Sequence, residues 1–481
     1  MTDPAKWQGR PFDDLREFIA ANEATGQLLR VDGAHWDLEI GAITEAAANR
    51  RPPKLLLFEN IPDHPGMGVL TNIMDKNAPQ RERLLYNVPS ELSDSDAIRY
   101  WKAQLTKKGS IPPRTVAGGP VMDVVTTGDD VNLNELPWVR WHGHDGGRYM
   151  CATAAVTKDS DSGFVNVGSY RFMYVDEQTF VGHLASGHHG DVIRKKYWAR
   201  GEACPISIAV GYDPSLLIAA GENLPWAEEE YGYAGWLRGA PVDVVPGVFT
   251  GLPVPATAEA VIEAEILPPD AGTAIEGPFG EATGYYGGGA RPSALIKAKA
   301  IMRRRDPIVM GAPPLFSTTR AILGNKAVLT WDELERLGIP GIQGVAKYWG
   351  LTVISIKQAF PGHAMRAATG ALGGIAGYYG KYIILVDEDI DPHNVDAVLW
   401  AIATRTDPAE SIDIIRRTWT NRIDPRLDPR KRERGDLTAS VAIIDATKPY
   451  HWKDEFPAST AMDPELIRET EKKWAHLIDG A

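Results

Sequence analysis

The chain reads CATAAVT from Cys151 to Thr157, ISIAV from Ile206 to Val210, VIEAEI from Val261 to Ile266 and ALIKAKAI from Ala294 to Ile301. These runs are short, apolar or alternating, and Gly and Pro turns separate them, as is usual for antiparallel strands. Their spacing predicts an antiparallel barrel or sandwich over residues 121–310, rather than a series of βαβ units.

The segments on either side have the pattern of α/β structure. Before the strand-rich region, a helix is expected over Asp13–Glu23, and short buried strands are expected at Lys54–Phe58 and Gly68–Thr71. After it, the apolar run Lys381–Val386 predicts a strand, and Asn394–Thr404 has a helical pattern. The expected fold class is therefore α/β (α+β), with strand-rich structure in the middle of the chain.

Linker-like segments set the expected domain boundaries. Gly109–Pro113 and Gly118–Pro120 are rich in Gly and Pro, so we expect the first boundary near residue 110. The pattern then predicts an N-terminal α/β domain, a central strand-rich domain and a C-terminal α/β domain, over residues 1–110, 111–315 and 316–481.

A last helix is expected at the end of the third domain. Asp463 is a suitable N-cap, and Pro464 suits the first helical position. Two interpretations of its apolar residues, among them Leu466, Ile467 and Trp474, stay open, because they can pack on a neighbouring subunit or on their own chain.

The composition argues against several classes of protein. A formal charge of −12 over 481 residues does not suggest the basic face that sequence-independent binding of nucleic acid needs. The two cysteines, Cys151 and Cys204, give no disulfide framework and no CxxC pattern, which favours a reducing compartment. No run approaches the ~18 apolar residues of a membrane span, and residues 1–10 lack an apolar signal core. We therefore expect a cytoplasmic protein without a nucleic-acid or membrane partner.

Two glutamates flank a tight loop in IEGPFGE, residues 275–281. Gly and Pro fix the backbone there, so Glu276 and Glu281 can be presented together, which suits general acid/base chemistry. Taken alone, such glutamates are more often solvated surface residues. The stretch TGYYGGG at residues 283–289 favours a functional interpretation, since glycine-rich backbone beside aromatic residues often lies close to a flat ligand.

A second polar cluster is NVGSYR at residues 166–171, on an expected strand. Its guanidinium, that of Arg171, suits paired hydrogen bonds to a carboxylate, although an isolated strand arginine is more often a surface charge. His188, His189 and the run Glu228–Glu230 carry side chains that bind divalent ions, in a spacing that is not diagnostic.

Other common motifs are missing from the sequence. There is no HExxH, so a zinc protease has no local support. The glycine-rich stretch Thr369–Gly377 fits neither GxGxxG after a strand nor a Walker A pattern, so we expect a loop there and no nicotinamide dehydrogenase.

Taken in order, these clusters resemble the UbiD-like family of decarboxylases that use prenylated FMN, in the branch that acts on aromatic and heteroaromatic acids. The matching elements span nearly the whole chain and are Asn166–Arg171, His188-His189, Glu230–Gly239, Glu276–Glu281 and the strand Ile383–Val386 with Asp387–Asp389. The resemblance implies an N-terminal α/β domain, a central split β-barrel that binds the flavin, and a C-terminal α/β domain for oligomerisation.

The resemblance also implies roles for single residues. The catalytic arginine would be Arg171, and the two acids would be Glu276, which positions it, and Glu281, which donates the proton. A divalent ion, Mn²⁺ for preference, would be held by Asn166, His189 and Glu230, and K⁺ is a further expected ion. Contacts to the cofactor are expected from Gly168, Ser169, Tyr170, Arg171, His188 and Lys381, with Lys381 at the phosphate.

The implied reaction is the reversible, non-oxidative decarboxylation of an aromatic or heteroaromatic carboxylic acid, through a covalent adduct with prenylated FMN. A prenylated-flavin synthase would supply the cofactor, and the chain would form a homodimer or a higher homo-oligomer. An apolar pocket for the acid is expected from Leu315, Phe316, Ile322, Leu323 and Leu437.

Two other classes of function stay open on the sequence alone. A metal-dependent hydrolase using His189 and Glu230 would lack flavin absorbance and release no CO₂. A non-catalytic oligomeric scaffold would use the same residues as plain structural polar groups.

Overall fold

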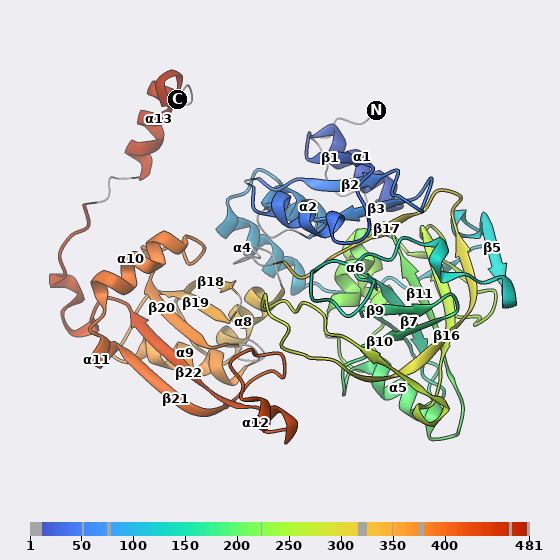
Figure 1. Cartoon of the computed structure of the whole chain (residues 1–481). Coiled ribbons are helices and arrows are strands. Elements are labelled where there is room, and N and C mark those ends of the chain that lie inside the picture. Colours follow the sequence, from blue (N-terminus) through green and yellow to red (C-terminus); the bar gives the residue numbers. More distant parts are fainter. Residues whose placement is uncertain are drawn as a thin grey trace.

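The computed structural model describes residues 12–50, 52–74, 78–222, 224–315, 325–348, 350–374, 380–460 and 464–478. These residues form sheets of four, ten, three and five strands. Figure 1 shows an N-terminal unit in blue, a strand-rich central unit in green and yellow, and a C-terminal unit in orange. The expected α/β fold in several parts is confirmed. Among the residues that the structure describes, no helix has the length and apolar character needed to cross a membrane.

The N-terminal unit is a four-stranded sheet in the order β1-β2-β3-β17, with helices beside it. Helix α1 has Asp14 as its N-cap and buries Leu15, Phe18 and Ile19, the apolar face expected from their spacing. Strand β17 comes from a later part of the chain and pairs in parallel with β3. The elements are α1 (Leu15–Ala24), β1 (Leu28–Asp32), α2 (Glu39–Ala48), β2 (Leu55–Glu59), β3 (Gly68–Thr71), α3 (Pro79–Leu85), α4 (Asp94–Leu105) and β17 (Ile308–Met310).

The central unit is a mainly antiparallel ten-stranded sheet in the order β6-β9-β10-β16-β14-β11-β7-β8, with β15 and β5 also paired to β16. Its inner strands are fully apolar or alternate, which is why the sequence pattern located them. The strands are β5 (Val124–Thr127), β6 (Tyr149–Met150), β7 (Ala154–Lys158), β8 (Val165–Gly168), β9 (Phe172–Asp176), β10 (Thr179–Gly182), β11 (Cys204–Val210), β14 (Ala260–Ile266), β15 (Thr273–Glu276) and β16 (Arg291–Arg303).

Three helices and a small sheet accompany the central strands. Two of the helices begin at polar residues of the sequence analysis, α5 at His189 and α7 at Glu230. The helices are α5 (His189–Trp198), α6 (Pro214–Gly221) and α7 (Glu230–Arg238). The small sheet has the order β13-β12-β4 and consists of β4 (Arg114–Thr115), β12 (Asp243–Pro246) and β13 (Pro253–Pro255).

The C-terminal unit is a five-stranded sheet in the order β18-β19-β20-β22-β21, in which β20 is parallel to both of its neighbours. The expected strand before Asp387 is β20, and the expected helix after Asn394 is α10. The elements are α8 (Asn325–Arg336), β18 (Ile342–Tyr348), β19 (Leu351–Ile356), α9 (His363–Gly373), β20 (Tyr382–Asp387), α10 (Val395–Arg405), α11 (Pro408–Ser411), β21 (Ile412–Trp419), α12 (Pro429–Glu433) and β22 (Thr438–Ala446).

The last helix, α13 (Pro464–Ile478), stands apart from the C-terminal sheet in Figure 1. The side chains of Leu466, Ile467 and Trp474 are 53%, 43% and 43% exposed. These three side chains are thus partly exposed. The expected N-cap, Asp463, lies outside the described residues.

The prediction of a loop over Thr369–Gly377 was wrong for its first part, because residues up to Gly373 belong to α9. Four alanines, at helical spacing, form the buried face of α9: Ala364, Ala367, Ala368 and Ala371. A side chain at Gly370 would press on Ile339 and Leu334, so glycine lets the helix pack closely. Small residues here serve helix packing, and residues 375–377 lie outside the described part.

The units share a hydrophobic core. One cluster of buried side chains includes Leu57 of the first sheet, Ala209 of the central sheet, and Trp331 and Leu385 of the C-terminal unit. A second cluster joins Phe58 and Val69 to the central strands. This shared packing fixes the ends of the central strands, where the polar clusters lie.

Candidate active site

Arg171 lies between two glutamates and bonds both. Its Nε donates to Glu276 Oε1 at 2.9 Å, and its Nη1 donates to Glu281 Oε1 at 2.9 Å. The Nη2 atom makes a longer bond of 3.5 Å to Glu276 Oε2. The side chain of Glu276 is fully buried, and those of Arg171 and Glu281 are each 12% exposed. The structure thus brings together the three residues predicted as catalytic.

The sequence pattern had suggested that Arg171 lies on a strand. In the structure it does not. Strand β8 ends at Gly168 and β9 begins at Phe172, so Arg171 occupies the connection between them. Its carbonyl accepts a hydrogen bond from His183 N at 3.2 Å, just past the end of the β9–β10 ladder. The connection ends the ladder and lets the guanidinium reach across to β15.

The two glutamates are presented from the end of β15. Glu276 is the last residue of that strand and pairs with Arg291 of β16, whose Nη2 lies 3.7 Å from Glu276 Oε2. Phe279 follows in the loop, and its ring centre lies 4.9 Å from the Arg171 guanidinium carbon. This contact holds the guanidinium plane in place from the side.

A neighbouring loop anchors the backbone between the glutamates. Gly146 N donates to the Pro278 carbonyl at 2.8 Å, and Asp145 Oδ1 accepts from Gly280 N at 3.2 Å. On the far side, Glu281 N donates to the Tyr285 carbonyl at 3.0 Å. Both carboxylates are therefore fixed by backbone bonds, in addition to their bonds with Arg171.

The charges of the cluster stabilise one another. Burial lowers the pKa of Arg171, but the negative charges and hydrogen bonds of Glu281 and Glu276 outweigh that effect, and the net pKa is raised. Arg171 is therefore a permanent cation. Burial lowers the pKa of Arg291, and the negative charges of Glu276 and Glu281 offset this effect only in part.

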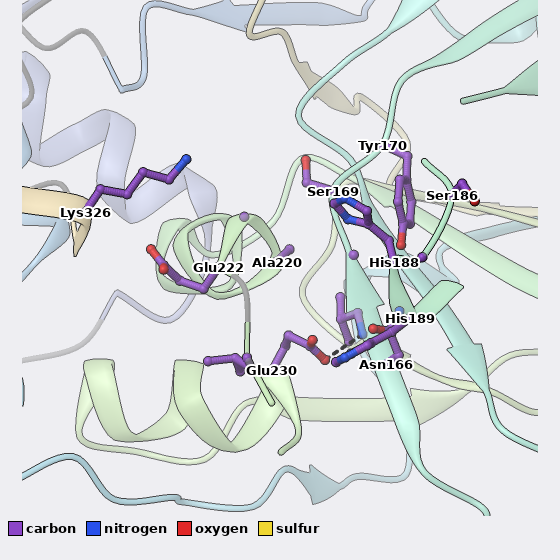
Figure 2. A pocket seen from close by; sticks show the side chains of 15 residues that line it. Asn166, Ser169, Tyr170, Ser186, His188, His189, Ala220, Glu222, Glu230 and Lys326 are labelled. Atoms are coloured by element: carbon purple, nitrogen blue, oxygen red, sulfur yellow. Dashed lines mark hydrogen bonds between the residues drawn. The ribbon is translucent and has the colours of Figure 1, made fainter. Parts of the chain in front are cut away.

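A cavity of about 560 Å³ opens beside this cluster and brings together the predicted metal ligands. Asn166 comes from β8, His189 is the first residue of α5, and Glu230 is the first residue of α7. Figure 2 shows the three side chains grouped on one side of the cavity, with Lys326 across from them. The same cavity is lined by four of the residues that we expect to contact the cofactor, Gly168, Ser169, Tyr170 and His188.

Glu230 is the most perturbed of these groups. It is 3% exposed, and its Oε2 accepts a hydrogen bond from Val167 N at 2.8 Å. Burial raises the pKa of Glu230 to about 7, and no ion pair joins it to a residue that the structure describes. Asn166 is equally buried, and its Nδ2 donates to Thr157 Oγ1 at 3.4 Å.

The ring of His189 is held by aromatic neighbours. It contacts Phe164 and Trp226 edge-on, with ring centres 5.8 Å and 5.1 Å apart. Burial lowers the pKa of His189, and the nearby His188 adds to this, which favours the neutral imidazole that binds metals. Among the described residues, no group of three or more His, Cys, Asp or Glu side chains could hold a metal ion, so Asn166 is needed to complete a ligand set here.

A smaller cavity of about 290 Å³ continues toward Arg171. It shares Ser169, Tyr170 and His188 with the larger one, and Arg171 and Phe279 form part of its wall. The two cavities therefore run side by side from the Asn166–Glu230 end to the arginine. This length suits an elongated ligand with a charged end and a flat end.

Lys381 does not lie with the other predicted cofactor residues. Its Nζ pairs with Asp424 Oδ1 at 2.8 Å in the C-terminal unit, and it is not among the residues that line either cavity. Its contact with a phosphate stays a prediction. Lys326 of α8 instead faces the larger cavity, opposite Glu222, and burial lowers its pKa.

The two glutamates before Glu230 have structural positions of their own. Glu229 is the N-cap residue of α7, and Glu228 pairs with Lys108. Neither lines the larger cavity, which agrees with the choice of Glu230 as the candidate ligand.

The expected apolar pocket for the acid is only partly described. Phe316, Ile322 and Leu323 lie outside the described residues. Leu315 and Leu437 are half-buried and do not line the cavity beside Arg171. The wall of that cavity comes from Cys151, Ala152, His183, Ala185, Phe279, Ala312 and Pro314, together with the shared residues.

Sequence reasoning missed His183, Lys326 and Glu222. His183 follows an ordinary β-type run and belongs to no motif, and only its position opposite Arg171 in the folded hairpin distinguishes it. Lys326 reaches the cavity from the C-terminal unit, a contact between distant segments that no local pattern reveals.

Comparison with known proteins agrees with this geometry. The chain matches family models described as the N-terminal, Rift-related and C-terminal domains of 3-octaprenyl-4-hydroxybenzoate carboxy-lyase, UbiD, over residues 19–91, 114–315 and 325–446. It therefore belongs to the UbiD family of carboxy-lyases.

Individual relatives cover almost the whole chain. Pyrrole-2-carboxylic acid decarboxylase from Pseudomonas aeruginosa is 31% identical, over 96% of this chain and 97% of that protein. The vanillic acid decarboxylase of Sedimentibacter hydroxybenzoicus, in its open form, matches with a TM-score of 0.83 and 29% identity, over 98% of this chain and 100% of that one. An evolved dimeric form of the UbiD-class enzyme HmfF from Pelotomaculum thermopropionicum, in complex with prFMN, matches with a TM-score of 0.78 and 25% identity, over 95% and 98%.

Proposed function

We propose that this chain catalyses the reversible, non-oxidative decarboxylation of an aromatic or heteroaromatic carboxylic acid, with prenylated FMN as its cofactor. The observation that carries the proposal is the bond of Arg171 to both Glu276 and Glu281 beside a cavity that adjoins the larger one, where Asn166, His189 and Glu230 gather. Family membership supports it, since relatives are named as decarboxylases of such acids and one solved relative holds prFMN.

The residues at the far end of the cavity fit a metal-bound phosphate. A buried carboxylate without an ion-pair partner among the described residues, such as Glu230, is costly unless a cation compensates it. Together with Asn166 and His189 it offers two oxygens and one imidazole nitrogen, a ligand set that suits Mn²⁺. We propose Mn²⁺ there, with K⁺ as a further ion to which we assign no ligands.

The residues along the cavity fit the rest of the cofactor. Gly168, Ser169, Tyr170 and His188 line the path from this end to Arg171. A Cβ at Gly168 would meet the ring of Tyr170, so glycine keeps the wall close to that ring. When bound, prenylated FMN supplies the centre to which the unsaturated acid bonds and which takes up the electron pair left by CO₂.

The protein would orient the acid and deliver the proton. Arg171 is a permanent cation at the apolar cavity, so it can hold a carboxylate or a flavin oxygen through its guanidinium. We assign the proton that replaces CO₂ to the carboxyl of Glu281, which is the more exposed of the two acids. Glu276 is fully buried and keeps Arg171 in orientation.

The assembly proposed is a homodimer or higher homo-oligomer formed through the C-terminal unit, with the cofactor supplied by a prenylated-flavin synthase. The apolar side chains of Ile412, Ile414 and Ile415 on β21 support the first part, because they lie exposed on the C-terminal unit. No observation specifically favours a hydrolase or a scaffold over the decarboxylase.

The test is to produce the protein together with a prenylated-flavin synthase and to screen aromatic acids for CO₂ release. The proposal predicts bound flavin and turnover of at least one aromatic acid. Protein that carries no flavin under these conditions, or loaded protein that releases no CO₂ from any acid, would contradict it. Benzoates and indole or pyrrole carboxylates form a suitable first panel.

A further inference from the structure

The cavity beside Arg171 contains a polar side chain to which no role has been given. Its wall is mostly apolar, with Ala152, Phe279 and Pro314 among its residues, and His183 is part of it. The volume of about 290 Å³ leaves room for a flat ring next to the arginine. His183 therefore faces the space where we place the acid.

The fold sets His183 directly opposite Arg171. Gly182 of β10 pairs with Phe172 of β9, and one residue further His183 N donates to the Arg171 carbonyl at 3.2 Å. Opposite residues of an antiparallel pair project their side chains from the same face. This explains why the imidazole and the guanidinium line the same cavity.

The charges with the largest effect on the pKa of His183 are those of basic groups. Burial lowers the pKa of His183 to about 3, and the charges of Arg291, Arg171, Arg194 and His188 act in the same direction. The imidazole is therefore neutral at physiological pH and offers one N–H donor and one nitrogen acceptor. It cannot serve as a counter-charge for the carboxylate of the acid.

The ring of His183 also makes no hydrogen bond to any residue that the structure describes. A half-buried polar group that loses water without gaining a partner destabilises the complex in which this happens. A flat ring that fills the cavity and expels water would leave the imidazole in that state, unless the ring itself has a hydrogen-bonding group.

We propose that His183 determines which aromatic acids are accepted, by hydrogen-bonding a polar group of the ring, namely a ring N–H or a hydroxyl. The inference rests on the proposed function and narrows its substrates to acids with such a group. Arg171 faces the carboxylate side of the cavity, and His183 faces the ring. Acids with a plain hydrocarbon ring bind more weakly, because they leave the imidazole without a partner.

The test is the binding of two matched pairs of acids, measured by calorimetry on protein loaded with unmodified FMN, which lacks the prenyl group that the proposed chemistry needs. The pairs are a pyrrole carboxylate against its N-methyl analogue, and a hydroxybenzoate against benzoate. Wild type should bind the polar member of at least one pair about tenfold more tightly, as expected for one hydrogen bond that would otherwise be lost. His183→Leu should remove the preference by weakening the polar member alone.

Two further variants separate hydrogen bonding from structure. His183→Asn keeps a donor and an acceptor and should retain part of the preference. His451→Leu changes an exposed histidine of the C-terminal unit and should bind both pairs as wild type does. Thermal melts establish whether each variant is folded. If His183→Leu does not fold, the preference of wild type still tests the inference.

Equal affinity for both members of both pairs in wild type would overturn the inference, and so would an unchanged preference in folded His183→Leu. Binding is measured without turnover, so the inference and the proposed function fail separately. Selective binding without CO₂ release would retain the role of His183 and reject the decarboxylase. CO₂ release from acids with polar and with plain rings, without a preference in binding, would support the decarboxylase and reject the role of His183.

Discussion

Arg171 organises the site because both of its acidic partners depend on it in different ways. Glu276 is fully buried, and Arg171 is its nearest cation, with Arg291 further away at 3.7 Å. Glu281 has some exposure and one bond of 2.9 Å to the guanidinium. A buried carboxylate that keeps its charge needs such a partner, whereas the more open one is better placed to exchange a proton. This difference supports the roles that we propose, with Glu276 positioning Arg171 and Glu281 transferring the proton.

The family resemblance predicted these three residues as catalytic, but the sequence did not show how they meet. Glycine and proline around Glu276 and Glu281 indicated a tight loop, and that interpretation agrees with the structure. Arg171 is more than a hundred residues away, and only the pairing of strands brings it within reach. Local patterns cannot encode such a contact, so the family resemblance supplied it.

The metal ligands can be tested at a single residue. His189→Ala removes the only imidazole proposed as a ligand. We expect both the metal content and the flavin occupancy of purified protein to fall by about tenfold or more, since loss of even a hydrogen-bonding partner of a metal ligand costs about 10- to 100-fold in metal affinity. Metal analysis and flavin absorbance measure the two quantities. His451→Ala, an exposed histidine away from the cavity, is the matched control.

An unchanged metal content in His189→Ala would reject the assignment of His189 as a ligand. A loss of flavin with the metal retained would instead place His189 on the cofactor. We expect the variant to fold. It loses the ring contacts with Phe164 and Trp226, but neither of these rings depends on the imidazole for a hydrogen bond.

At the scale of elements, the loop after β15 depends on its neighbour, the segment around Gly146. A Cβ on Gly146 would meet the carbonyl oxygen of Gly277, a backbone atom that cannot move alone. Gly146→Ala should therefore displace the loop that carries Glu281 and reduce CO₂ release by tenfold or more, about the effect of a small misplacement of a catalytic group.

Gly143→Ala is the control, because a Cβ there has nothing within 4 Å and the residue lies in the same segment. Circular dichroism should show that both variants keep the fold. Equal activity of Gly146→Ala and Gly143→Ala would mean that the loop tolerates displacement, and the anchoring argued from these contacts would be wrong.

Helices and strands were predictable where apolar residues recur with a strong periodicity. They were ambiguous where small residues dominate the sequence. The alternating apolar pattern of residues 294–301 located the centre of β16, and the spacing of Leu15, Phe18 and Ile19 located α1. The glycines of α9 misled, because glycine also appears where a helix needs close packing. Arg171 and His183 lie just outside β9 and β10. The ends of these strands are set by tertiary pairing, which local propensity does not predict.

On the scale of the whole molecule, the C-terminal unit exposes an apolar edge. Strand β21 pairs with β22 alone among the described strands, and Ile414 and Trp419 on it are 48% and 45% exposed. An exposed apolar edge strand is a template for pairing with another chain. This is the surface through which we expect two copies to associate.

Ile414→Lys should weaken that association at least tenfold, since it places a charge where apolar surface is buried, and burial of such a side chain contributes about 1.5–3 kcal/mol. Analytical ultracentrifugation over a dilution series measures the shift. Val125→Lys, on exposed β5 of the central unit, is the control. A monomeric wild type, or a dimer unaffected by Ile414→Lys, would show that β21 is not the interface.

The cavity also connects units. Its lining comes mainly from the central unit, but Lys326 belongs to α8 of the C-terminal unit. Reaching this arrangement needs the shared core that contains Ala209 and Trp331, which fixes the two units against each other. The domain boundaries expected from composition and linkers stay a prediction, and no local pattern indicated this contact between units.

The central claim is that the site removes CO₂ from an aromatic acid and that Glu281 returns a proton to the same carbon. The measurement is turnover in deuterated solvent by flavin-loaded wild type and Glu281→Gln, with the product examined by NMR. Wild type should carry deuterium at the carbon that lost CO₂, and Glu281→Gln should form this product ~10² to 10⁴ times more slowly while keeping its flavin. Near wild-type turnover by Glu281→Gln with full flavin loading, or product without solvent deuterium at that carbon, would contradict the account.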